Sequence, residues 1–235
     1  RTIENSRERD ATTVEAGDEE VEADEMQDEF ADHFNGLVTP KIIITTSDHP
    51  SAGMFDFLGD FLRMLPNATY YKRQGYDLKK ICEYGSNNGF THLVVLNENR
   101  KEVNGMVLVY LPYGPTAHFR ISNLVLSKQI RGHGKPTRHR PELILNNFTT
   151  RLGHRVGRLF GSLYPFNPEF RGRRAVTFHN QRDFIFVRQH RYIFESKEAG
   201  KARKEHKGHL ATAEDAPRLT KEQRKIERKK ARKKA

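Results

Sequence analysis

Short β-branched runs alternate with segments of helix-spaced apolar residues in the first part of the chain. The pattern predicts, in chain order, a buried strand at 41–46, a helix at 54–65, a strand at 68–71, a helix at 77–84 and a strand at 92–97. Ser51 stands where its hydroxyl can cap the first of these helices. Such βαβαβ alternation predicts an α/β domain whose helices cover a sheet.

The pattern changes after residue 100, where strands follow one another directly. It predicts adjacent strands at 105–112 and 116–121, an exposed loop at 128–140, a long helix at 142–163, a hairpin of strands 175–178 and 184–187 joined by a four- or five-residue loop, and a further strand at 191–194. The loop has five basic residues and no large apolar residue after Ile130, so it is expected on the surface. The whole middle of the chain is therefore α/β or α+β.

The predicted helix at 142–163 carries two further patterns. Gly153, Gly157 and Gly161 recur at every fourth position, and each costs about 1 kcal/mol of helix propensity relative to alanine. A close backbone approach by another element or by a protein partner would explain that cost, and the alternative is a weakly formed helix. Arg151, Arg155 and Arg158 fall together on a neighbouring face.

The charge is divided unevenly along the 235 residues, although the net charge is only +11. Residues 1–39 have a net charge of −10, residues 40–195 of +12, and residues 196–235 of +9. Both ends are poor in apolar residues, so neither can build a core that offsets the entropy of folding. We therefore expect residues 1–39 to be mostly extended or disordered and residues 196–235 to form a basic tail. Phe30 and Phe34 are spaced to dock one helical turn on a partner or on the domain itself. A further hypothesis is that the acidic segment screens the basic domain from binding nonspecific RNA.

Several classes of protein receive no support from the sequence. No apolar run approaches the roughly 18 residues of a membrane span, and the single cysteine, Cys82, excludes a disulfide framework and a cysteine-rich zinc site. The stretch at 132–137 lacks the glycine and the Ser/Thr of a phosphate-binding loop. A Cys82 nucleophile stays open, but a buried structural thiol fits its apolar helix face better. We expect no enzyme, no metal, no cofactor and no small-molecule substrate. The chain begins with Arg1 rather than Met, which indicates a fragment.

The basic residues of the middle are clustered and are mostly arginine. Eight occur between 128 and 158 against one acidic residue, and six occur between 171 and 191 against one. Clustered arginines favour RNA phosphates, and no helix-turn-helix or zinc-finger pattern supports DNA readout. The alternatives are a basic surface without a specific partner and a scaffold that meets acidic proteins. The expected RNA-binding residues are Lys128, Arg131, Lys135, Arg138, Arg140, Arg151, Arg155, Arg158, Arg171, Arg173, Arg174, Arg182, Arg188 and Arg191; the expected protein contacts are Phe30, Phe34, Gly153, Gly157 and Gly161.

Three segments resemble the Brix family, namely 142–154, 177–186 and 190–194, with Gly114-Pro115-Thr116-Ala117-His118-Phe119 matching its first-half signature. The resemblance implies a two-half α/β Brix domain at 40–195, related to anticodon-binding folds, with mixed sheets covered by helices. Its first half is expected at about 40–126 and its second at about 141–195. It also implies a non-catalytic role in nuclear, nucleolar assembly of the large (60S) ribosomal subunit, through pre-rRNA, other pre-60S factors and a dedicated protein partner. One departure concerns the strand that closes the family's second sheet: Glu195 is followed here by a charged tail instead.

Overall fold

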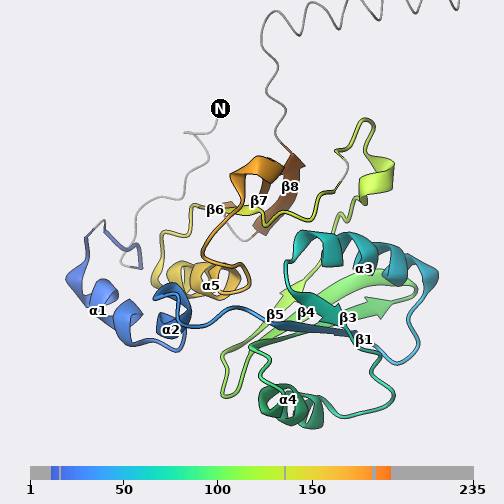
Figure 1. Cartoon of the computed structure of the whole chain (residues 1–235), viewed down its shortest axis with the longest axis horizontal. Coiled ribbons are helices and arrows are strands. Elements are labelled where there is room, and N and C mark those ends of the chain that lie inside the picture. Colours follow the sequence, from blue (N-terminus) through green and yellow to red (C-terminus); the bar gives the residue numbers. More distant parts are fainter. Residues whose placement is uncertain (1–11, 16, 135, 182–183, 192–235) are drawn as a thin grey trace, which may run out of the picture. The chain divides into compact units, whose positions relative to one another are not determined.

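A mixed five-stranded sheet forms the first part of the computed structural model (Figure 1), which describes residues 12–15, 17–134, 136–181 and 184–191. Its strand order is β2-β1-β3-β4-β5, with β1 parallel to β2 and β3, and with β4 and β5 antiparallel to their neighbours. The strands are β1 (Ile42–Thr46), β2 (Ala68–Tyr70), β3 (His92–Asn99), β4 (Glu102–Tyr110) and β5 (Thr116–Arg120). The five strands predicted here are all confirmed, with small shifts at their ends.

Two helices cover opposite faces of this sheet. Helix α3 (Ala52–Met64) begins after Ser51, whose Oγ accepts a hydrogen bond from the Met54 N–H at 3.4 Å, as predicted. Its apolar side packs on Ile42 and Ile44 of β1. Helix α4 (Leu78–Asn87) packs on the other face. Successive side chains of a strand point to opposite faces, so Ile43 points away from α3 and contacts the apolar side of α4. The predicted arrangement of helices on a sheet is therefore correct.

A second sheet of three strands has the order β6-β7-β8. Strand β6 (Glu142–Asn146) runs parallel to β7 (Arg174–Gln181), and β7 pairs antiparallel with β8 (Phe184–Arg191). The predicted hairpin is confirmed, but its strands are longer and its connection shorter than expected. Of the strand predicted at 191–194, only Arg191 is among the described residues, and it ends β8. Residues 192–194, Lys135, Arg182 and the basic tail lie outside the described residues.

The long helix predicted at 142–163 is wrong in its first half. Residues 142–146 form β6, and only α5 (Arg151–Gly161) is helical. Asn147 ends the strand with a positive φ of 61°, and the Thr150 hydroxyl caps α5 by accepting from the Gly153 N–H at 3.0 Å. Leu145 and Phe148 match a helical spacing in the sequence, but they pack beside Gly157 of α5 from β6 and from the connection that follows it.

The acidic segment also differs from the expectation of a mostly extended chain, because it contains α1 (Glu19–Gln27) and α2 (Ala31–Phe34). The Asp18 carboxylate caps α1 by accepting from the Glu20 N–H at 3.2 Å. Phe30, between the helices, is fully buried and meets the Tyr110 ring edge-on at a centroid distance of 5.0 Å. The segment is thus anchored by an aromatic side chain rather than by its own weakly apolar helices.

One hydrophobic core joins the two sheets. Phe160 of α5 stacks on Phe178 of β7 at 4.4 Å and contacts Phe119 of β5 at 5.0 Å between ring centroids. Two short 3-10 turns, η1 (Ser127–Gln129) and η2 (Phe170–Gly172), lie in the connections that flank β6 and α5. Within the described ranges, the helices are too short or too polar to cross a membrane.

A buried histidine also links the first sheet to the end of α5. His92 of β3 is 1% exposed, and its Nε2 lies 2.9 Å from the Ser162 Oγ just after α5. Its Nδ1 lies 2.8 Å from the Thr91 Oγ1. Burial, with a smaller repulsion from His33, lowers the pKa of His92 to about 3, so the ring is neutral near pH 7.

Candidate nucleic-acid interface

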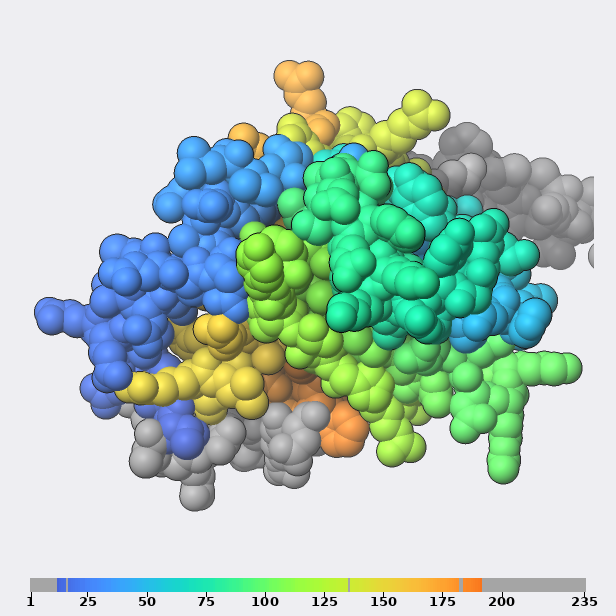
Figure 2. Space-filling view, turned by 90° about the horizontal axis from the view of Figure 1, so that it is seen from below, coloured from blue at the N-terminus to red at the C-terminus, as the bar shows by residue number. Residues whose placement is uncertain are grey.

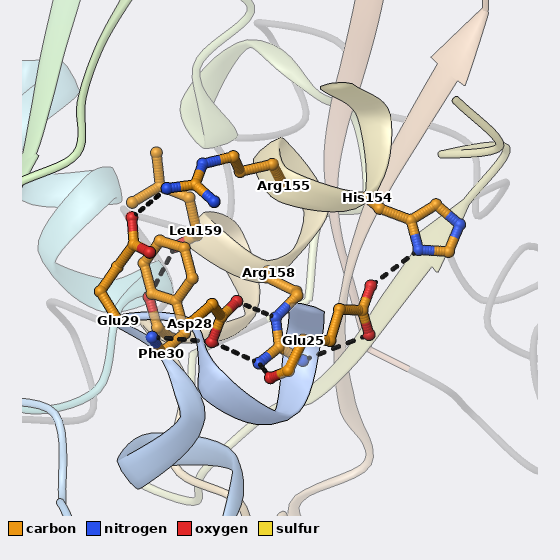
Figure 3. A network of polar contacts seen from close by, with 9 residues as sticks. Glu25, Asp28, Glu29, Phe30, His154, Arg155, Arg158 and Leu159 are labelled. Carbon is orange, nitrogen blue, oxygen red and sulfur yellow. Dashed lines mark hydrogen bonds and ion pairs between the residues drawn. The ribbon is translucent and has the colours of Figure 1, made fainter. Parts of the chain in front are cut away.

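Arg155 and Arg158 of α5 lie against acidic residues at and just after the end of α1 (Figure 3), and Arg151 lies against Glu20 within α1. Arg151 Nη2 lies 2.9 Å from Glu20 Oε2, and Arg155 Nη2 lies 2.5 Å from Glu29 Oε1. Between these arginines along the helix, His154 Nδ1 is 2.9 Å from Glu25 Oε1. The acidic segment and the α5 arginines therefore form one ion-pair network, which we call the α1–α5 clamp.

Arg158 is the most enclosed member of the clamp. Its side chain is 15% exposed, and its Nε and Nη2 donate to the two carboxylate oxygens of Asp28 at 2.6 and 2.7 Å. Nη2 also donates to the Glu25 main-chain oxygen at 2.7 Å, and the guanidinium lies 4.3 Å from the centre of the Phe34 ring. Such a two-pronged, partly buried pair is strong and directional. An RNA phosphate at this face would have to displace these carboxylates.

The contacts expected for the three glycines of α5 are made by this chain itself. A Cβ added to Gly153 would lie 3.0 Å from the Thr150 Oγ1. A Cβ added to Gly157 would lie 3.5 Å from the Phe148 ring, and one added to Gly161 would lie 2.9 Å from the Phe34 ring. The predicted close approach is present: at Gly153 it includes the Phe148 backbone, whose C atom would lie 3.2 Å from an added Cβ, and at Gly157 and Gly161 it is made by side chains. Phe30 and Phe34 likewise contact their own chain, Phe30 through the Tyr110 ring and Phe34 beneath the Arg158 guanidinium. Of the two alternatives left open by the sequence, docking within the chain is the one that these contacts display, and contact of the five residues with a protein partner stays a prediction.

Arg174, expected to bind RNA, has a structural role instead. It is 7% exposed, and its Nη1 donates to the carbonyl oxygens of Thr137 and His139 at 2.6 and 2.8 Å. Its Nη2 donates to the carbonyl oxygen of Arg63, at the end of α3. Burial lowers the pKa of Arg174. The arginine fastens the loop before β6 and the end of α3 to β7, and it offers no surface to RNA.

The remaining arginines lie on segments that touch one another. An added Cβ at Gly134 would meet the Arg191 Cβ at 3.0 Å, so the loop approaches β8. An added Cβ at Gly172 would collide with the His139 side chain, so η2 packs on the same loop. We call the exposed arginines of these segments the loop–hairpin surface: Arg131, Arg138, Arg171, Arg173, Arg188 and Arg191.

Lys128 and Arg140, at the two ends of the loop, pair with carboxylates. Lys128 Nζ lies 2.5 Å from Asp56 Oδ2, and Arg140 Nε lies 2.8 Å from Glu169 Oε1. The Arg140 guanidinium lowers the pKa of the Glu169 carboxyl by hydrogen bonding. All four side chains of these two pairs are more than 40% exposed. Ion pairs that are exposed to solvent contribute little to the free energy of unfolding. These two cations can therefore exchange a carboxylate for a phosphate at small cost.

Exposed aromatic residues accompany these arginines, and the sequence reasoning did not single them out. Phe184 and Phe186 of β8 are 64% and 43% exposed. They alternate with Ile185 and Val187, so they share a sheet face with Arg188. The sequence carried a signal for this arrangement: Phe184, Phe186 and Arg188 are two residues apart, and such residues share one face of a strand. Aromatic rings beside arginines form a surface on which unpaired bases stack.

Comparisons with known proteins agree with this fold. A family model described as Brix domain matches residues 47–231, which extends past the end at 195 expected from the sequence. Ribosome production factor 1 of Xenopus laevis is 55% identical over 198 residues, which make up 84% of this chain and 58% of that protein. Ribosome production factor 1 of Saccharomyces cerevisiae is 46% identical over 200 residues, or 84% of this chain and 66% of the relative. The chain thus spans about six tenths of these relatives' length.

The fold also recurs in a solved structure. The crystal structure of a probable ribosomal biogenesis protein from Aeropyrum pernix K1 superposes with a TM-score of 0.50 at 16% identity. The superposition covers 65% of this chain and 91% of that chain. At this identity the likeness concerns the arrangement of helices and strands.

Proposed function

Because this chain belongs to the Brix family, we propose that it is a ribosome assembly factor that binds pre-rRNA during maturation of the large (60S) ribosomal subunit. The relatives named ribosome production factor 1 support a role in ribosome biogenesis. The proposal places the protein in the nucleus and nucleolus, among other pre-60S assembly factors and ribosomal proteins. It requires no catalytic step and no cofactor.

The loop–hairpin surface is the observation that supports RNA binding most directly. Its six arginines are exposed and come from three segments, of which the loop contacts both β8 and η2. The arginine fork matches phosphate oxygens in pairs, and Phe184 and Phe186 offer rings to unpaired bases on the same strand as Arg188. Binding would thus combine sequence-independent phosphate contacts with base stacking.

Salt dependence tests this assignment. Arg131, Arg138 and Arg188 are replaced together by alanine in the full chain, and affinity for a fragment of large-subunit pre-rRNA is measured by fluorescence anisotropy at several salt concentrations. Each lost phosphate contact reduces the slope of log affinity against log salt by about 0.7 to 0.9. We therefore expect the slope to fall by about 2 and the affinity to fall at least tenfold.

The matched control removes the same charge elsewhere. Lys79, Lys80 and Arg120 are exposed and belong to α4 and β5. Their triple alanine variant should change the slope by less than one, because these side chains lie outside the proposed surface. Equal changes in the two triple variants would show that only net charge matters and would reject the loop–hairpin surface.

A second candidate function is a protein scaffold within pre-ribosomes whose basic surface meets acidic partners. The α1–α5 clamp favours it, because acidic residues of α1 and of the segment just after it already pair with the α5 arginines within this chain. A partner's acidic helix could use the same arginines. The clamp equally suits an acidic segment that screens these arginines from nonspecific RNA. Crosslinking to RNA in cells separates the two candidates, since a scaffold would show no enriched rRNA position.

A further inference from the structure

The α4 side of the five-stranded sheet is only partly covered. Helix α4 packs through Ile81 and Cys82 on Ile43 and Leu93, which belong to β1 and β3. Strand β2 is the edge strand of this sheet in the described part of the chain and pairs with β1. A groove of about 540 Å³ lies there, between α4 and the segment that follows β2. Figure 2 shows the side of the molecule on which α4 lies. We call this hollow the α4 groove.

Aromatic rings form much of the wall of the α4 groove. Tyr76 and Tyr84 meet edge-to-face at 6.3 Å, and Tyr71 and Phe90 do so at 6.0 Å between ring centroids. The three tyrosines are 51%, 48% and 56% exposed in chain order, so their rings are open to solvent. Exposed rings that already stand edge-on to one another leave faces on which a flat molecule can stack.

The charge of the groove has one sign. Lys41, Lys72 and Arg73 line it, and among the described lining residues none is acidic. Lys41 Nζ lies 4.1 Å from the centre of the Phe90 ring and donates to the Asn88 carbonyl oxygen at 3.2 Å. Arg73 Nε donates to the Tyr76 carbonyl oxygen at 3.1 Å, which positions its guanidinium beside a tyrosine of the wall. A ligand with an anionic group next to an aromatic ring fits this arrangement.

A buried hydroxyl in the lining lacks a partner. Thr45 is 1% exposed, and among the described residues nothing forms a hydrogen bond with its Oγ1. Thr45 lines the α4 groove from β1. Buried polar atoms are almost always hydrogen-bonded, because leaving one unpaired destabilises the fold. A donor or acceptor on the edge of a bound ring would satisfy this hydroxyl.

We propose that the α4 groove binds an unpaired nucleotide of single-stranded RNA, with the base stacked on the tyrosines and the phosphate held by Lys72 and Arg73. This inference rests on the proposed RNA-binding function and adds a second RNA contact, on the sheet that does not carry β8. An RNA nucleotide accounts for the rings, the cations and the buried hydroxyl together. An acidic protein segment accounts for the cations alone.

Binding of a short oligonucleotide tests the groove. Fluorescein-labelled hexauridylate is titrated with the full chain, and anisotropy gives the affinity. Tyr84→Ala should weaken binding about tenfold, because stacking on one ring is worth about that much. Tyr113→Ala is the matched control, since Tyr113 is 99% exposed on the turn between β4 and β5 and should leave the affinity unchanged.

Thr45→Val separates ligand binding from folding. Valine has nearly the same shape but lacks the unpaired hydroxyl, so the thermal midpoint should rise while the affinity for hexauridylate falls severalfold. A fall in both quantities would mean that the hydroxyl serves the fold, and it would overturn this part of the proposal. The opposite changes expected here cannot arise from misfolding.

The remaining outcomes are decisive as well. Suppose that the triple arginine variant lowers the salt slope for the pre-rRNA fragment as expected, but Tyr84→Ala leaves the affinity for hexauridylate unchanged. The groove proposal alone is then overturned. If neither RNA binds, the proposed function fails, and the groove proposal fails with it. If a glutamate decapeptide binds as tightly as hexauridylate and is equally sensitive to Tyr84→Ala, the groove takes acidic protein, and the proposal is overturned.

Discussion

Replacing Arg158 with alanine should destabilise the fold more than any other change in the α1–α5 clamp. The variant loses the fork to Asp28, the bond to the Glu25 carbonyl oxygen and the packing over Phe34. It also leaves the Asp28 carboxylate, only 8% exposed, without its cation. Removing one partner of a buried ion pair costs about 3–5 kcal/mol. Asp28 Oδ1 keeps a bond from the Phe30 N–H, so we expect about 2–4 kcal/mol.

Urea unfolding measures this loss. With a slope of about 2 kcal/mol per molar urea, the midpoint should fall by about 1–2 M. Arg151→Ala is the matched control: its ion pair to Glu20 is 58% and 68% exposed, so its midpoint should not move measurably. The contrast between the two arginines follows from the burial of Arg158 and from its further contacts with the Glu25 carbonyl oxygen and the Phe34 ring.

Two results would refute this reasoning. An unchanged midpoint in Arg158→Ala would mean that the clamp contributes nothing to the free energy of unfolding. Equal shifts in Arg158→Ala and Arg151→Ala would mean that net charge, and not the enclosed fork, sets the effect. Arg158→Lys keeps the charge without the fork and should lie between wild type and alanine.

Two further predictions concern pH and helix packing. Because the pKa of His92 is about 3 in the folded state and about 6.5 when unfolded, only the unfolded state gains this proton between those values, and stability falls as pH falls. In urea titrations, the stability advantage of wild type over His92→Gln should shrink by about 2 kcal/mol from pH 7 to pH 5; a constant difference would contradict the burial of a neutral ring. Gly161→Ala should lower the thermal midpoint because its Cβ would lie 2.9 Å from the Phe34 ring, whereas Gly59→Ala in α3, with open space around it, should raise it by helix propensity. A rise in both midpoints would show that the Phe34 ring yields without cost.

The first sheet was predictable because its signals are local. Residues 42–46 are β-branched throughout, and Ser51 starts α3 with a side-chain cap that the sequence displays. The segment 142–146 was misassigned because Leu145 and Phe148 satisfy a helical spacing on both sides of the turn at Asn147. What makes this segment a strand is its pairing with β7, about thirty residues away, which no local pattern reports.

The candidate site was predicted in composition but not in arrangement. The sequence identified clustered arginines, yet it gave Arg174 and Arg188 the same role, although one is buried under carbonyl oxygens and the other is exposed on β8. It also could not foresee the α4 groove, whose rings come from α4 and from the connections on either side of it. Burial depends on which segments meet, and this information is nonlocal.

By itself, the sequence determined the division of charge, the α/β alternation and the spacing of the α5 glycines and arginines. These features depend on residue type and on neighbours within a few positions along the chain. Only the tertiary structure decided that the acidic segment folds onto the α5 arginines, with Phe30 anchored against Tyr110. Opposite charges attract in many arrangements, and the one that forms is selected by the apolar side chains that pack beside them.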